Sequence, residues 1–414
     1  MTHIAIIGSG PAGCYLAEQL LRLVPAASID IIEQLPVPFG LIRYGVAPDH
    51  QSTKAVARIF ERVLARDRVS FFGNVCVGRD VSLEELRSLY DAVVLATGAQ
   101  RDRKLGIPGE DLPGVMGSGA FVGWYNGHPQ RQALNIDNVQ SAVIIGNGNV
   151  ASDVARILAK GADELAGSDI APGFADWLAA QPIQTIHVVG RRSAADAKFT
   201  DHELAELGEL RRARPVVNAA DLVGDSAVVK TLRSFTESPT RDMPIDIRFH
   251  FQLTPVAFCG EQQLEATEFC SAADARIEIP AQLAITCISY EAIACGGISP
   301  VKGCFANEQG KIAERLYAVG WAKRGPSGTI PTNRTEAQQV AQKMALEIAD
   351  GQRPGGAGLR DLLQKRGVRR VDYDAWRLID AAELAGAGAD LCRRKFCTID
   401  EMLQAAGAPE LRLA

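Results

Sequence analysis

Two glycine-rich turns with the same spacing constrain the fold of this chain more than any other feature. The first glycine turn is Gly8-Ser9-Gly10-Pro11-Ala12-Gly13, and the second is Gly146-Asn147-Gly148-Asn149-Val150-Ala151. Each follows an apolar, β-branched run, residues 3–7 and 142–145, and each leads into a helical pattern. Strand, turn and helix in this order are typical of a dinucleotide-binding unit, in which the helix N-terminus stabilises a pyrophosphate. Two such turns predict two dinucleotides.

The residues after the second strand of each half predict which dinucleotide binds there. Residues 28–32 read as that strand in the first half and lead to Glu33, 20 residues beyond Gly13. A carboxylate at this spacing binds ribose hydroxyls and repels a 2′-phosphate, so this half suits FAD or NAD. Residues 185–190 read as the corresponding strand of the second half and lead to Arg191 and Arg192.

The two guanidiniums suit the 2′-phosphate of NADPH, because their forked donors and fixed charge match a dianion. FAD in one half and NADPH in the other indicate a flavoprotein that takes hydride from a nicotinamide. The alternative interpretation of Arg191 and Arg192 is a solvated turn. An inserted helix within residues 161–182 also leaves the register of the preceding strand open.

Composition excludes several classes of protein. The 414 residues suffice for two or three domains, and 47% apolar with 22% charged residues is ordinary for a globular enzyme. The net charge of −5 argues against a nucleic-acid partner. We expect no membrane insertion, no targeting segment and a cytoplasmic location, because apolar runs are short and an extended pattern begins at His3.

The nine cysteines show no metal or redox spacing. No two of them form a C-x-x-C pair, so a disulfide relay beside the flavin, an iron–sulfur cluster and a zinc site are not expected. We predict no metal. Cys14 reads as a small buried residue. A disulfide between Cys392 and Cys397 is the alternative.

Three strand patterns predict how the two halves are connected. Residues 91–99 close the FAD half, an irregular link follows at 103–115, and residues 283–288 mirror the first segment. Residues 316–320 are a third such strand, which we expect to return to the FAD half. The prediction is an α/β fold with two Rossmann-like domains, the NADPH domain being inserted within the FAD domain. Its boundaries are 1–105 for the first part of the FAD domain, 106–315 for the NADPH domain, and 316–414 for the second part with a C-terminal tail.

Several longer segments narrow the class further. They are Val37–His50, Phe71–Val81, Phe121–Gly127, Gly148–Arg156, Val189–Arg192 and Gly320–Ile330. Together they resemble the adrenodoxin-reductase-type ferredoxin–NADP(+) reductases over nearly the whole chain. The resemblance implies hydride transfer from NADPH to FAD, followed by delivery of single electrons to a ferredoxin-type iron–sulfur protein.

The resemblance also implies positions for both cofactors. Beside the glycines Gly8, Gly10 and Gly13, the residues implied for FAD are Ala12, Glu33, Leu41, Val77, Trp321, Gly328, Thr329 and Ile330. The residues implied for NADPH are Asn147, Gly148, Asn149, Val150, Arg191, Arg192 and Glu203. For Trp321, the alternative is an ordinary core aromatic residue.

His50 and Asp153 are the candidates for the catalytic handling of protons, since reoxidation of a flavin by single electrons releases protons. The alternative for Asp49-His50 is an N-cap of a helix over residues 51–65. The alternative for Asp153 is an interaction with the dipole in the first turn of its helix.

Departures from the family pattern concern mainly the electron acceptor. Asn147 stands where the family pattern has the longer glutamine, and Pro331 follows the tripeptide implied to contact the flavin. The segment 221–246 is shorter than its counterpart in the family. The basic side chains in or near that region are Lys230, Arg233, Arg241, Arg211, Arg212 and Arg214. Two rivals therefore stand beside a monomeric ferredoxin reductase. One is a tailoring oxidoreductase or oxidase for a small molecule, and the other is a binding module that has lost catalysis.

Overall fold

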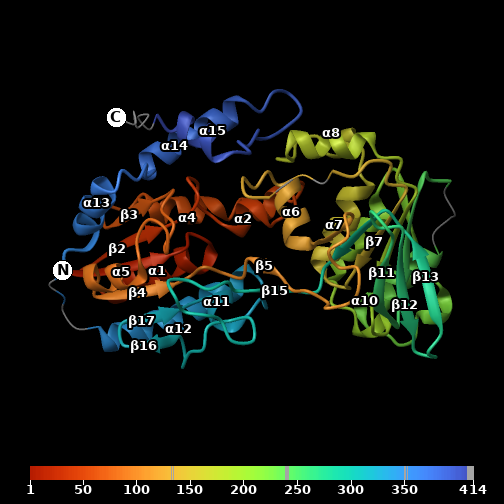
Figure 1. Ribbon diagram of the computed structural model, residues 1–414, viewed down its shortest axis with the longest axis horizontal. Helices are drawn as coiled ribbons and strands as arrows, with labels where there is room; N and C mark the ends of the chain where they lie inside the picture. Colours follow the sequence, from red (N-terminus) through yellow and green to blue (C-terminus); the bar gives the residue numbers. More distant parts are fainter. Residues whose placement is uncertain (132, 134, 238–241, 349–350, 352, 408–414) are drawn as a thin grey trace. The chain divides into compact units, whose positions relative to one another are not determined.

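The computed structural model describes residues 1–131, 133, 135–237, 242–348, 351 and 353–407. The chain forms two compact units. Unit 1 contains Met1–Val46, His50–Arg101 and Tyr290–Ala414, and unit 2 contains Ala47–Asp49 and Asp102–Ser289. In Figure 1 the red and orange N-terminal segments share unit 1 with cyan and blue C-terminal ones, while unit 2 is mostly yellow and green. The predicted insertion of one Rossmann-like domain within the other is therefore confirmed.

Unit 1 is built on a sheet that is parallel apart from one edge strand. In spatial order its strands are β16 (Lys311–Ala313), β17 (Leu316–Ala318), β4 (Ala92–Leu95), β1 (Thr2–Ile7), β2 (Ala27–Ile32) and β3 (Val69–Phe72). β17 pairs with β4 in parallel, as expected for a strand that returns to this half. Successive residues of β1 pack into separate apolar clusters, Ile4 and Ile6 into one and Ala5 and Ile7 into the other. Both faces of the sheet are therefore covered, as parallel sheets require.

The helices of unit 1 cover these two faces. α1 packs against the long helix α12, and residues of α5 and α13 belong to the cluster on the opposite face. The helices are α1 (Pro11–Leu23), α2 (Leu41–Tyr44), α3 (Gln51–Lys54), α4 (Ala57–Leu64), α5 (Leu83–Leu89), α11 (Trp321–Arg324), α12 (Ile330–Glu347), α13 (Gly355–Lys365), α14 (Tyr373–Ala385) and α15 (Ile399–Ala405). The prediction of a single helix over residues 51–65 was wrong, because a turn at Ala55 and Val56 separates α3 from α4.

Unit 2 contains a wholly parallel sheet and a small antiparallel one. The parallel sheet has the order β6 (Val115–Gly117), β14 (Leu283–Thr286), β7 (Ser141–Ile145), β8 (Thr185–Val189), β10 (Ile245–His250) and β9 (Ala213–Val216). β11 (Leu253–Cys259), β12 (Ala266–Ser271) and β13 (Arg276–Pro280) form the second sheet. Apolar residues of both sheets share one core cluster, which includes Val143, Val189 and Phe269.

The helices of unit 2 lie both before and after the second glycine turn. They are α6 (Ser118–Tyr125), α7 (Asn149–Ala159), α8 (Pro172–Ala180), α9 (Asp201–Ala205) and α10 (Ala227–Glu237). Short 3₁₀ turns lie at 162–164, 194–196, 206–209 and 219–221. α8 is the helix expected within residues 161–182. β8 nevertheless stays in register with β7, Val189 lying opposite Ile145, so the insertion does not shift the strand that leads to Arg191.

The second predicted domain boundary differs from the structure. The chain leaves unit 1 after Arg101 and returns at Tyr290, through the short paired strands β5 (Arg101–Asp102) and β15 (Tyr290–Glu291). Residues 290–315 thus belong to unit 1, although the sequence placed them in the NADPH domain. The physical reason is packing: Cys295 and Phe305 are buried in the same apolar cluster as β1 and β4.

Candidate functional site

The first glycine turn has the shape that close approach of a phosphate requires. Gly8 has φ +110°, and a Cβ atom there would lie 2.5 Å from the Ala96 carbonyl oxygen. A Cβ atom on Gly13 would lie 2.2 Å from the Gly8 carbonyl oxygen, so helix and strand meet without a side chain between them. At Gly10, by contrast, a Cβ atom would find open space. Gly10 caps α1 without a side-chain hydrogen bond, which leaves the helix N-terminus fit for an anion.

Glu33 directly follows β2 and is fixed to this turn. Its carboxylate accepts hydrogen bonds from the Ser9 amide at 3.1 Å, the Ser9 hydroxyl at 2.7 Å and the Leu35 amide at 3.2 Å. Burial raises the pKa of Glu33, although these hydrogen bonds favour the ionised form. The arrangement suits a ribose, whose hydroxyls would donate to a carboxylate held beside the pyrophosphate turn.

Two apolar side chains proposed for FAD differ in exposure. Leu41 is 44% exposed, and it begins helix α2. Gly40 before it comes so close to the turn that a Cβ atom would lie 3.3 Å from the Gly10 Cα. Val77 is half-buried and packs against the apolar cluster of the sheet.

The segment from Gly320 to Ile330 returns to the first glycine turn from the far end of the chain. Gly320 has φ +69°, and a Cβ atom there would lie 2.4 Å from the Ala12 Cβ. Trp321 is half-buried, stacks on Tyr290 with ring centroids 6.0 Å apart, and donates from Nε1 to the Ser327 carbonyl at 3.1 Å. It is therefore not an ordinary buried core residue.

The tripeptide that follows stands at the start of the long helix α12. Gly328 and Thr329 are exposed, and Ile330 is the first residue of the helix. Thr329 and Thr332 form a capping box. Pro331 lies in the first helical turn, where the missing N–H would have no partner within the helix.

The second glycine turn repeats the geometry between β7 and α7. Gly146 has φ +141°, and at Gly148 a Cβ atom would find open space. Residues 198–200 close over one side: the Lys198 amide donates to the Asn147 carbonyl at 2.6 Å, and the Thr200 amide to Asn149 Oδ1 at 2.8 Å. Asn147 Oδ1 is buried and accepts no hydrogen bond from the described residues, so the turn keeps an unused polar atom.

Arg191 and Arg192 stand beyond the strand that neighbours this turn. Both side chains are exposed, and neither forms a hydrogen bond or ion pair with another described residue. Val150 lies in the first turn of α7. Exposure agrees with a phosphate site and with a solvated turn alike. The positions, unlike the roles, follow from the register of β7 and β8.

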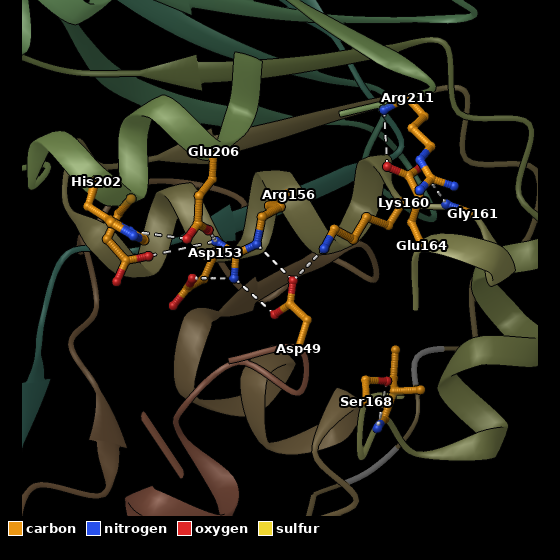
Figure 2. A network of polar contacts seen from close by, with 12 residues as sticks. Asp49, Asp153, Arg156, Lys160, Gly161, Glu164, Ser168, His202, Glu206 and Arg211 are labelled. Atoms are coloured by element: carbon orange, nitrogen blue, oxygen red, sulfur yellow. Dashed lines mark hydrogen bonds and ion pairs between the residues drawn. The ribbon is translucent and has the colours of Figure 1, made fainter. Parts of the chain in front are cut away.

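A buried guanidinium that the sequence analysis did not single out pairs with several carboxylates of unit 2. Arg156 of α7 has a side chain only 2% exposed (Figure 2). It contacts Asp49 with two hydrogen bonds of 2.9 and 3.0 Å, Asp153 at 2.8 Å, and Glu206 at 3.0 Å. Glu203 lies farther away, at 3.7 Å. We call these five residues and Lys160, which contacts Asp49 at 2.7 Å, the Arg156 cluster.

The Arg156 cluster accounts for Asp49, and the bounds of α7 exclude one of the two interpretations of Asp153. Burial alone would raise the pKa of Asp49, but Arg156 and Lys160 outweigh it and hold this pKa well below its usual value. The carboxylate is thus an ion-pair partner, and the N-cap interpretation was wrong. Asp153 is the fifth residue of α7, beyond its first turn, so the dipole interpretation was wrong too.

His50 belongs to unit 1, unlike Asp49. It occupies the N-cap position of α3 but forms no side-chain cap. The proton-handling roles of His50 and Asp153 stay predictions, as do the cofactor contacts of the individual residues.

Neither the cysteines nor the basic side chains identify a docking surface for an electron acceptor. All nine cysteines are free thiols, so the alternative disulfide between Cys392 and Cys397 is absent.

Arg211 and Arg214 pair with Asp163 and Asp246, at 3.3 and 2.8 Å. Arg241 lies outside the described residues. Among the described helices, none has the length and apolar character needed to cross a membrane.

Known proteins resemble the chain over nearly its full length. The model of the pyridine nucleotide-disulphide oxidoreductase family matches residues 2–320. Mitochondrial NADPH:adrenodoxin oxidoreductase of Homo sapiens is 37% identical over 453 residues, covering 98% of this chain and 92% of that protein. NADPH-ferredoxin reductase FprA of Mycobacterium tuberculosis is 36% identical over 450 residues, covering 97% and 98%. The structure of Mycobacterium tuberculosis FprA in complex with NADPH matches with a TM-score of 0.92 at 34% identity, covering 98% of this chain and all of that one.

Proposed function

The chain belongs to the pyridine nucleotide-disulphide oxidoreductase family, and from this premise we propose that it is an NADPH-dependent ferredoxin reductase containing FAD. The observation that carries the proposal is the pair of glycine turns in two separate units, each with open space at its middle glycine. Glu33 follows the first turn and two exposed arginines lie near the second. One turn therefore suits a dinucleotide without a 2′-phosphate, and the other suits NADPH.

FAD, when bound, supplies the chemistry of accepting two electrons as hydride and releasing them singly. The chain's own residues would bind FAD and orient it. The N-terminus of α1 and the backbone of the first glycine turn would hold the pyrophosphate, and Glu33 the ribose. Leu41, Val77 and Trp321 offer apolar surface, and Gly328 permits close approach of the backbone, since its φ is +80°.

In unit 2 the N-terminus of α7 and the backbone of the turn from Asn147 to Val150 would hold the NADPH pyrophosphate. Arg191 and Arg192 would bind the 2′-phosphate. Glu203, whose backbone carbonyl accepts from Ser152 at 2.8 Å, would contact the adenosine end. His50 and Asp153 are proposed to take up and release protons.

The proposed partner is a ferredoxin, the class of acceptor named for the bacterial relative. We propose a cytoplasmic location for this chain, in keeping with its ordinary content of apolar and charged residues. Two reduced ferredoxins would form for each NADPH oxidised.

The test begins with the purified protein and its absorption spectrum. A bound flavin should be bleached by NADPH in the absence of oxygen and should recover when oxidised ferredoxin is added. NADH serves as the cofactor control and a quinone as the small-molecule acceptor control. A chain that binds no flavin would refute the proposal. Turnover with the quinone but with none of a panel of ferredoxins would favour the tailoring oxidoreductase.

A further inference from the structure

The segment Phe39–Tyr44 is strained where it meets the first glycine turn. Phe39 has φ +84°, in a region that bulky residues rarely adopt, whereas the φ of +48° at Gly40 is one that glycine adopts without strain. The Phe39 amide donates to the Ser9 carbonyl at 3.2 Å, which fastens the segment to the turn. Strain of this kind persists only where the surroundings hold it.

The surroundings that hold this segment come from the C-terminal helices. The Phe39 ring meets Trp376 of α14 edge-on, with centroids 5.3 Å apart. Arg43, four residues later, forms an ion pair with Glu383 of the same helix, 340 positions away in the sequence. The Glu383 side chain has no exposed surface and that of Arg43 is 9% exposed.

Glu383 also contacts the segment that follows α14. Its carboxylate accepts from the Phe396 amide at 2.9 Å and pairs with Arg393 at 3.0 Å. Lys395 donates to the Arg43 carbonyl at 3.3 Å, and its ammonium lies 6.0 Å from the centre of the Tyr44 ring. One buried carboxylate therefore ties residues 393–396 to the segment beside the glycine turn.

The charge of Glu383 is stable in these surroundings. Burial alone would raise its pKa, but the guanidiniums of Arg43 and Arg393 and the Phe396 amide outweigh burial and keep the pKa below the usual value. Loss of the carboxylate would leave Arg43 buried beside Tyr44 without its ionic partner, which strongly destabilises such an arrangement.

We propose that Glu383 is a positioning residue for FAD, because it docks the C-terminal helices onto the segment that carries Leu41 beside the first glycine turn. The inference rests on the proposed function, which assigns FAD to that turn. Docking of residues 373–405 and binding of FAD then favour each other by the same factor, as linkage requires. Glu383 itself acts through Arg43.

The experiment compares Glu383→Gln with Asp374→Asn in the full-length protein. Asp374 lies on the same helix and is exposed, so its variant loses the same charge without disturbing the buried cluster. FAD is titrated into each apoprotein and its fluorescence is followed. We expect Glu383→Gln to bind FAD at least ~10-fold more weakly, equivalent to about 1.4 kcal/mol. Asp374→Asn should match the unaltered protein.

Two further readouts separate positioning from general destabilisation. The rise in Tm that FAD produces should shrink in Glu383→Gln, because ligand stabilisation depends on affinity. Binding of NADP(+) to unit 2 should not change. Equal lowering of Tm in the apo and FAD-bound forms, with unchanged FAD affinity, would overturn the inference.

A second variant covers the case in which Glu383→Gln does not fold. Arg43→Met removes the guanidinium through which Glu383 acts, while Glu383 keeps its ion pair with Arg393 and its hydrogen bond from the Phe396 amide. Weaker FAD binding by this variant supports the inference, and unchanged binding overturns it. If the unaltered protein bound no FAD, the proposed function itself would fail, which is a distinguishable result.

Discussion

Replacing Arg191 and Arg192 together with alanine should abolish the preference for NADPH over NADH. Both guanidiniums are exposed, and neither forms an ion pair or hydrogen bond with another described residue, so their removal breaks no contact within that part of the chain. They lie beyond β8, which stays in register with the strand that leads to the second glycine turn. The variant should therefore fold normally and bind the pyrophosphate as before.

The magnitude follows from the exposure of the two side chains. A hydrogen bond to a charged group contributes about 1.5–3 kcal/mol when formed in the protein interior. At an exposed position solvent screening places each arginine at the lower end, about 1.4 kcal/mol or tenfold in affinity. The double variant should thus raise the KM for NADPH on the order of 100-fold and leave that for NADH within about twofold.

The assay measures reduction of the bound flavin at a series of NADPH and NADH concentrations. Arg276→Ala is the matched control, because Arg276 is an exposed arginine of the same unit on β13. Added salt should weaken NADPH binding to the unaltered protein and hardly affect the double variant. Equal losses for the two nucleotides would refute the assignment of a 2′-phosphate site and restore the solvated turn.

Three other outcomes test the fold around the site. Gly13→Ala should abolish FAD binding but spare NADP(+) binding, because its Cβ would lie 2.2 Å from the Gly8 carbonyl oxygen; a fluorescence titration decides, and retained FAD contradicts it. Asp49→Asn removes a carboxylate from buried Arg156 and should lower the free energy of unfolding by about 3 kcal/mol in denaturant melts. Burial, with neighbouring histidine and arginine charges, lowers the pKa of His187 to about 4. Unfolding stability should therefore fall as the pH drops from about 6.5 towards 4, by at most about 3 kcal/mol for this group. His187→Gln should flatten that fall, and an unaltered pH profile would contradict the argument.

Much of the fold could be predicted because its signals are local. Buried parallel strands read as short apolar runs, and Gly8, Gly13 and Gly146 are required because a Cβ atom there would lie too close to a backbone carbonyl oxygen. Glu33, Arg191 and Arg192 could be proposed from the sequence because they stand just beyond the ends of β2 and β8.

The charged residues buried in each unit could not be found in this way. Arg156 pairs with Asp49 across 107 positions, and Glu383 pairs with Arg43 across 340. On a helix, an isolated arginine or glutamate reads as a solvated side chain, and nothing in its neighbourhood reveals a distant partner. The predicted boundary between residues 315 and 316 was misplaced for a similar reason, because Phe305 is buried in unit 1 by tertiary packing without any periodic pattern around it.

The three residues Ala47–Asp49 limit how this protein can be divided. They belong to unit 2, although the residues on either side belong to unit 1, and the Pro48 carbonyl accepts from the Asp169 amide at 3.2 Å. A fragment cut at the obvious points, residues 102–289, would lack Asp49 and leave Arg156 and Lys160 without their shared carboxylate. A chimaera that exchanges nucleotide-binding domains between relatives should therefore carry the tripeptide along with the domain it serves.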